Sequence, residues 1–400
     1  MSYLPQAKEK LRGLRQDGRG RILLTVATGW GLTIGGRMVY PVLLPHLRSA
    51  YGLSLSSAGV LLTVLFAAYA IGQLPSGVLT DRIGEVATLV VSMGVSAAAI
   101  VLIVTAGSTL FLYASTAVYG FGIGLYAIAR FTALDNVYSE HFGTAIGVTN
   151  SASEIGQAAL PPVAGFLAVA LGWQYGFGFT VPLFVLVACA LWIYVPQRSP
   201  TETNADDALS LETGRYLCSQ LSQPSIVRGT AIFVLGISIW QAFTGFYPTY
   251  LVEVKGLSST AAGGVFGLYF ALAAFVHPIS GTIYDRWGLR YTFLLVGVSV
   301  VALALLPVVE GLWSLVALTV PLSALLAFGT ATESYLVDAL PDDVAGTGFG
   351  LLRTISFGLG AASPVLFGAA ADRGFFDEVF LLLAGLAGLM VLLATQIPAD

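Results

Sequence analysis

Long apolar segments separated by short polar connections make up nearly all of this 400-residue chain. Each is about as long as a helix must be to cross a bilayer, ~20 residues. Segments of this kind lie at about 21–44, 54–80, 86–106, 108–134, 142–170, 174–196, 226–250, 258–284, 291–309, 312–337, 345–371 and 376–397. They predict an all-α, polytopic membrane protein with twelve transmembrane helices.

The composition separates this chain from soluble proteins. Hydrophobic residues make up 56% of it and charged residues only 10%, and the mean hydropathy is +0.83. Its 46 glycines would weaken soluble helices, but in lipid small residues let helices approach closely. The two cysteines, Cys189 and Cys218, do not have the spacing of a disulfide framework or a metal site, so we expect no metal and no cofactor.

An internal repeat divides the chain into two parts. The motif Gly-x-x-x-Asp-Arg-x-Gly occurs twice, 204 residues apart, at Gly77, Asp81, Arg82 and Gly84 and again at Gly281, Asp285, Arg286 and Gly288. Farther along, Pro161 and Pro364 match at an offset of 203. Repetition over this length indicates two similar structural units. We predict a six-helix half with a basic tail over 1–196, a linker over 197–225 and a second six-helix half over 226–400.

The motif resembles the loop signature of the major facilitator superfamily, in which it lies between the second and third membrane spans. The second copy lies between spans eight and nine, and the resemblance covers nearly the whole chain. The family pattern continues with basic residues, whereas Glu85 and Val86 follow the first copy here, and Leu289 and Arg290 follow the second. The resemblance implies two pseudo-symmetric halves around a central cavity, with spans three, six, nine and twelve outermost.

The distribution of cations predicts the orientation in the membrane. Twelve lysines and arginines lie on the side of the N-terminal tail, against three on the opposite side. By the positive-inside rule, both termini are cytoplasmic in the cell membrane. A basic tail beside a membrane span is far more often a topology signal than a nucleic-acid site. We therefore expect the lipid bilayer as a partner, no nucleic acid, and a monomer.

Five ionisable side chains lie within the predicted spans: Arg37, Arg130, Glu154, Glu333 and Arg353. Each costs about 2.5–3.5 kcal/mol at the centre of a membrane helix, so such groups mark functional sites by default. None lies in the interior of spans three, six, nine or twelve. The charges therefore occur only in helices that the resemblance places around the cavity.

Arg37 shares one face of span one with aromatic residues, and span seven carries a similar face without the charge. We predict that these faces bind the substrate, through Trp30, Arg37 and Tyr40 in the first half and Trp240, Gln241 and Tyr247 in the second. Arg37 could form the outer end of an anion-binding cavity. Alternatively, it could reach the headgroups or bond backbone freed by Pro41.

Glu154 is the ionisable group closest to the middle of the membrane. Asn150, a further predicted substrate residue, and Gln157 share its helix face. A buried carboxyl either pairs with a cation or holds a proton, so we predict that Glu154 carries a coupling proton. A structural hydrogen bond between helices is the alternative.

Arg130 and Glu333 occupy equivalent positions, 203 residues apart, near the ends of spans four and ten. We predict that they form gates with the Asp-Arg loops of the two motifs. Arg353 lies at the position equivalent to Asn150. It could be a second anion site or part of the same gate, and the sequence does not separate the two.

These features predict a secondary transporter that moves a small, anionic organic solute by alternating access, coupled to an ion that is most simply a proton. Proton-coupled efflux of amphiphilic compounds is the alternative within this class. A membrane receptor or sensor on the same scaffold is the alternative outside it. An enzyme is not expected, because no HExxH, GxxxxGK[ST] or paired-cysteine pattern occurs.

Overall fold

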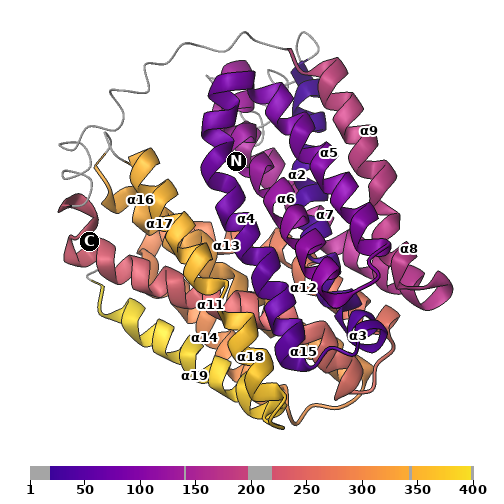
Figure 1. Ribbon diagram of the computed structural model, residues 1–400. Helices are drawn as coiled ribbons and strands as arrows, with labels where there is room; N and C mark the ends of the chain where they lie inside the picture. Colours follow the sequence, from indigo (N-terminus) through magenta and orange to yellow (C-terminus); the bar gives the residue numbers. More distant parts are fainter. Residues whose placement is uncertain (1–18, 139–140, 197–218, 342–344, 398–400) are drawn as a thin grey trace. The chain divides into compact units, whose positions relative to one another are not determined.

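The computed structural model describes residues 19–138, 141–196, 219–341 and 345–397, and every regular element in these ranges is a helix (Figure 1). The first half contains α2 (Arg19–Arg37), α3 (Val39–Tyr51), α4 (Leu55–Ile83), α5 (Glu85–Val104), α6 (Thr109–Tyr138), α7 (Phe142–Leu171), α8 (Trp173–Gly178) and α9 (Thr180–Tyr194). The second contains α11 (Pro224–Glu253), α12 (Ser259–Ala271), α13 (Ala273–Trp287), α14 (Leu289–Leu305), α15 (Leu312–Ser323), η3 (Ala324–Leu326), α16 (Ala327–Ala339), α17 (Ala345–Gly360), α18 (Ser363–Ala371) and α19 (Phe376–Thr395).

The predicted membrane spans correspond to these helices. Within the described ranges, 11 helical segments are long and apolar enough to cross a membrane, and Leu289–Leu305 is a shorter apolar helix at the place of predicted span nine. The expectation of an all-α, multi-pass membrane protein is confirmed.

The chain divides into two compact units. Unit 1 comprises Met1–Leu43 and Val64–Glu202, and unit 2 comprises Leu44–Thr63 and Thr203–Asp400. The segment Leu44–Thr63 thus belongs by its contacts to unit 2, although it lies in the first half of the sequence. The linker boundaries at 197–225 stay a prediction, and residues 197–218 lie outside the described ranges.

Each unit repeats the same packing pattern. In unit 1, α2 packs against α7, and α5 packs against α6 and α9. In unit 2, α11 packs against α17, and α14 packs against α15, α16 and α19. The sequence repeat is therefore also a repeat of helix neighbours.

Span one is interrupted immediately after Arg37. The α2 helix ends there and α3 begins at Val39. Pro41 explains the interruption, because a proline lacks the N–H that would bond the carbonyl four residues earlier, and its ring clashes with that carbonyl. The break places Arg37 at a helix end.

The α2 and α7 helices approach each other with backbone nearly touching backbone. A Cβ on Gly156 would lie 2.0 Å from the carbonyl oxygen of Gly31, and one on Gly35 would lie 2.4 Å from that of Gly156. Only glycine allows this separation, as in other close crossings of membrane helices. On α2 the crossing extends to Gly35, two residues before Arg37 at the end of the helix.

Both copies of the repeated motif end in a left-handed glycine. Gly84 has φ 85° and Gly288 has φ 79°, a region that residues with a Cβ rarely adopt. Each glycine follows one helix, α4 or α13, and starts the next, α5 or α14. The motif therefore forms the predicted tight turn between two helices in both halves.

Candidate functional site

Arg37 is buried in unit 1 against two aromatic rings of α4. Its side chain is 3% exposed. Its Cζ lies 4.7 Å from the ring centroid of Tyr69 and 5.6 Å from that of Phe66. A guanidinium over a ring face is attracted by the negative potential of that face. The Arg37 side chain is therefore packed inside unit 1, against the aromatic rings of α4.

Arg130 lies on the aromatic face of α2. Its Cζ is 3.9 Å from the Trp30 ring centroid, and its Nη1 donates a 2.6 Å hydrogen bond to Oγ1 of Thr149 on α7. Arg130 is also 3% exposed. Because Trp30 and Arg37 are seven residues apart on one helix, or about 10 Å along its axis, unit 1 presents two buried guanidinium groups to the same side of α2.

The other predicted residues of the first aromatic face have packing partners of their own. Trp30 stacks on Tyr126 with a centroid distance of 6.3 Å, and the Tyr126 hydroxyl donates to the carbonyl of Val26. Tyr40 is fully buried, and its hydroxyl donates to Oγ1 of Thr116 at 3.0 Å. These contacts order the face of span one that carries Arg37 and against which Arg130 packs.

The polar positions of α7 differ in exposure. Asn150 is exposed, Glu154 is half-buried and Gln157 is buried. Ala152 and Gly156 are the residues of α7 at the close crossing with α2, and Glu154 lies between them in sequence. The proton-carrying role of Glu154 stays a prediction.

The matching residues of unit 2 lie on α11. Gln241 is fully buried and donates from Nε2 to the carbonyl of Phe357 on α17 at 3.4 Å. Trp240 is 8% exposed, and Tyr247 is fully buried with its hydroxyl 3.3 Å from Oγ1 of Thr319. This face packs into its own unit much as the first aromatic face does.

Glu333 and Arg353 form an ion pair in unit 2. Nη1 of Arg353 lies 3.5 Å from Oε1 of Glu333, and the side chains are 29% and 36% exposed, respectively. The Arg353 guanidinium also lies 5.4 Å from the ring centroid of Phe357. The ion pair does not separate the two predicted functions of Arg353, anion site and gate, and both stay predictions.

The charged residues of the two motifs lie at helix ends. Asp81, Arg82, Asp285 and Arg286 are all exposed. Arg130 and Glu333, their predicted partners, contact Thr149 and Arg353, respectively. The predicted gating role of the motif residues therefore stays a prediction.

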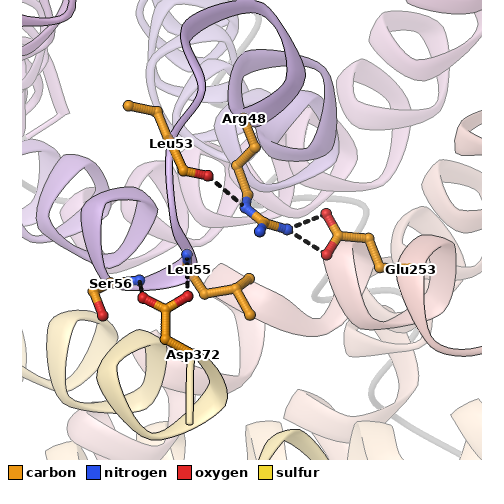
Figure 2. Close-up of polar contacts among 6 residues, drawn as sticks. All are labelled: Arg48, Leu53, Leu55, Ser56, Glu253 and Asp372. Atoms are coloured by element: carbon orange, nitrogen blue, oxygen red, sulfur yellow. Dashed lines mark hydrogen bonds and ion pairs between the residues drawn. The ribbon is translucent and has the colours of Figure 1, made fainter. Parts of the chain in front are cut away.

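A polar cluster that the sequence did not indicate lies in unit 2, at the end of α4 opposite to the motif. Figure 2 shows this cap cluster, which consists of Arg48, Leu53, Leu55, Ser56, Glu253 and Asp372. The Asp372 carboxylate accepts hydrogen bonds from the backbone N–H groups of Leu55 and Ser56, both at 2.7 Å. Arg48 pairs with Glu253 and donates from Nε to the carbonyl of Leu53 at 3.2 Å.

Asp372, which follows the last residue of α18, acts as a cap for α4. The first N–H groups of a helix have no partner within it, and a carboxylate there is favoured by the helix dipole. Burial alone would raise the pKa of Asp372, but the hydrogen bonds from Ser56 and Leu55 outweigh it and lower the pKa from its ordinary value. The carboxylate is therefore held in its charged form.

The sequence identified charged residues within the spans, but it did not identify the residues that they contact. Arg130 was identified, but Trp30 and Thr149 as its contacts were not, because they are 100 and 19 residues away in the chain. Asp372 follows the last residue of α18 and has no counterpart in the first half, where the equivalent residue is Val169. That break of the repeat is the one signal that could have identified it.

Comparison with known proteins gives consistent matches over nearly the whole chain. A family model described as Major Facilitator Superfamily matches residues 26–364. The hexuronate transporter of Bacillus subtilis (strain 168) is 26% identical over 375 residues, which cover 88% of this chain and 88% of that protein. The probable sulfoacetate transporter of Cupriavidus necator is 27% identical over 386 residues, which cover 88% and 87%.

Solved structures share the fold. The crystal structure of a nucleoside transporter matches with a TM-score of 0.81 at 11% identity, and the match covers 94% of this chain and 99% of that one. At this identity the likeness shows the fold alone.

Proposed function

The chain belongs to the major facilitator superfamily and is therefore a membrane transporter rather than an enzyme, and from that premise we propose that it moves a small organic anion by alternating access. The observation that carries this proposal is the pair of guanidinium groups in unit 1. Arg37 and Arg130 lie within candidate membrane spans, each is 3% exposed, and each rests on an aromatic face.

Arginine is the residue suited to an organic anion. Its planar fork of N–H donors matches the two oxygens of a carboxylate, and it is weakly hydrated and stacks on rings. Trp30 and Tyr69 support the two guanidinium groups in this way. The relatives named for hexuronate and sulfoacetate, a carboxylate and a sulfonate-bearing acid, support the same class of solute.

Proton coupling is assigned to Glu154. A carboxyl of this depth must exchange its proton as access alternates, and its neighbours on α7 are polar rather than cationic at the spacing of one turn. We place both termini in the cytoplasm from the excess of cations on that side. The two Asp-Arg motifs are assigned to the gates at the same side.

Transport in liposomes tests this function. Full-length protein should accumulate D-glucuronate or sulfoacetate against a gradient when a pH gradient is imposed, and it should not accumulate glucose. Glu154→Gln should reduce accumulation to the passive level but keep exchange of the anion across equal pH. Glu378→Gln, which removes an exposed carboxylate at the start of α19, should behave as wild type.

Two results would contradict the proposal in different ways. If the wild type moves an amphiphilic cation but neither anion, the anion assignment is wrong and amphiphile efflux replaces it. If Glu154→Gln retains accumulation and exchange equally, another group carries the proton.

A further inference from the structure

The ion pair of unit 2 is accessible rather than sealed. Arg353 and Glu333 are 29% and 36% exposed, and their closest charged atoms are 3.5 Å apart. The ion pair of Lys255 with Glu310 in the same unit is different, since the lysine side chain is 1% exposed and its Nζ lies 2.9 Å from the carboxylate. Arg353 is thus held loosely, and its side chain is partly exposed.

The geometry of this contact allows the guanidinium of Arg353 to form shorter hydrogen bonds with another carboxylate. Strong charge-assisted hydrogen bonds have heavy-atom distances of about 2.7–2.9 Å, and a guanidinium binds a carboxylate best through two parallel bonds. The contact between Arg353 and Glu333 joins one pair of atoms at 3.5 Å, which is longer than this range. A carboxylate that reached Arg353 in the two-bond arrangement would compete successfully with Glu333.

Glu333 is the carboxylate that pairs with Arg353 in the part of the chain that the structure describes. The α17 helix, which carries Arg353, packs against α11 and against α16, which carries Glu333. On the helix next to α16, His277 of α13 shares a 2.8 Å hydrogen bond with Thr330 rather than with Glu333. Glu333 thus serves as the counter-ion of Arg353 in this structure.

We propose that Arg353 is a second anion subsite and that Glu333 is its internal competitor, a carboxylate that occupies the subsite until the carboxylate of the solute displaces it. The inference rests on the proposed function, because it requires an anionic solute. It resolves the two predicted roles of Arg353, since the same ion pair closes the subsite when it is empty and opens when the anion arrives.

Equilibrium binding of D-glucuronate to the purified full-length protein tests the proposal. Glu333→Gln should bind about two- to fivefold more tightly than wild type, the factor expected when a partly exposed ion pair no longer competes. Arg353→Gln should bind more weakly than wild type. The double variant should match Arg353→Gln, because removal of the competitor has no effect once the subsite is lost.

Controls separate competition from changes in net charge or folding. Glu310→Gln removes a carboxylate from the other ion pair and should bind as wild type. Glu333→Asp keeps the charge on a shorter side chain and should bind with an affinity between those of wild type and Glu333→Gln. If Glu333→Gln does not fold, the binding affinity of Glu333→Asp tests the proposal instead.

The opposite results are equally clear. If Glu333→Gln and Glu333→Asp bind no more tightly than wild type, the ion pair is structural and the inference is wrong, while the proposed function stands. If the wild type binds neither D-glucuronate nor sulfoacetate, the proposed function fails, and the inference fails with it.

Discussion

The two halves place opposite charges at the same point of the repeat. Arg130 on α6 is 3% exposed and bonds Thr149 on the neighbouring α7. Glu333, 203 residues later on α16, is more than a third exposed and pairs with Arg353 on the neighbouring α17. Helix packing is thus repeated, but the charges that it carries are not.

A second exchange accompanies the first. Glu154 of α7 corresponds to Phe357 of α17 at the same offset. The carboxyl within the predicted spans lies on α7 in the first half and on α16 in the second. In unit 1, Arg37 and Arg130 therefore contact aromatic rings, whereas in unit 2 Arg353 is paired with the carboxylate of Glu333.

Removal of the buried Arg130 guanidinium should have the largest effect on transport. A buried hydrogen bond to a charged group contributes about 1.5–3 kcal/mol. Arg130→Gln should therefore lower the rate of D-glucuronate uptake per unit concentration about tenfold or more. Arg353→Gln should lower it by only about two- to fivefold, because this site is partly exposed. Uptake into liposomes at low solute concentration measures both.

The exposed Arg373 gives the control for this comparison. It donates to the carbonyl of Ala369 in the preceding helix, α18, and Arg373→Gln should transport as wild type. Equal losses for Arg130→Gln and Arg353→Gln would show that the halves contribute alike, against the difference inferred from their burial.

A smaller effect is expected at the cap cluster, where the halves also differ. Asp372 caps α4, whereas the equivalent Val169 has an apolar side chain that is 57% exposed. Asp372→Ala should lower the free energy of unfolding by about 0.5–1 kcal/mol, the lower part of the range for a lost helix cap because the site is exposed. Val169→Ala should change it less. Thermal unfolding in detergent at pH 7 compares the two variants.

The contribution of Asp372 should also depend on pH. Its pKa is lower in the folded protein than its ordinary value. The stabilisation is therefore complete above the ordinary pKa of a carboxyl and is lost as the pH falls through the lower, folded value. The difference between wild type and Asp372→Ala should be constant from pH 7 to about pH 5 and should shrink in stronger acid. A constant difference down to about pH 2 would contradict this assignment.

The smallest effect is expected where the motif departs from the family pattern. Glu85 starts α5, is 7% exposed and accepts a 3.3 Å hydrogen bond from Nδ2 of Asn136, whereas the equivalent residue of α14 is Leu289. Glu85→Gln keeps an acceptor for Asn136 but loses the charge at the helix start. It should cost about 0.3–0.5 kcal/mol, measured as a fall in the unfolding temperature.

Glu378→Gln is the matched control for Glu85→Gln, because Glu378 also lies in the first turn of a helix but is exposed. Its effect should be smaller, since solvent screens an exposed charge near a helix end. If Glu85→Gln is as stable as wild type and Glu378→Gln is not, burial does not strengthen the interaction.

The sequence was sufficient for the helices and for their repetition. A bilayer has a fixed thickness, so the length of an apolar segment identifies a membrane helix without knowledge of its neighbours. The break after Arg37 also follows from the local effect of Pro41. The costly charges could be identified for the same reason, because Arg37, Arg130 and Glu333 are visible in the sequence as exceptions within apolar segments.

Only the tertiary structure determined what those charges contact. Arg130 reaches Trp30 across 100 residues of chain, and Asp372 reaches Leu55 across 317. Such contacts depend on which helices are neighbours and how they are rotated, and hydropathy carries no information about either. A repeat predicts equivalent backbone positions, but a side chain bonds whatever its own neighbours offer: a threonine for Arg130, a carboxylate for Arg353 and two helix-end amides for Asp372.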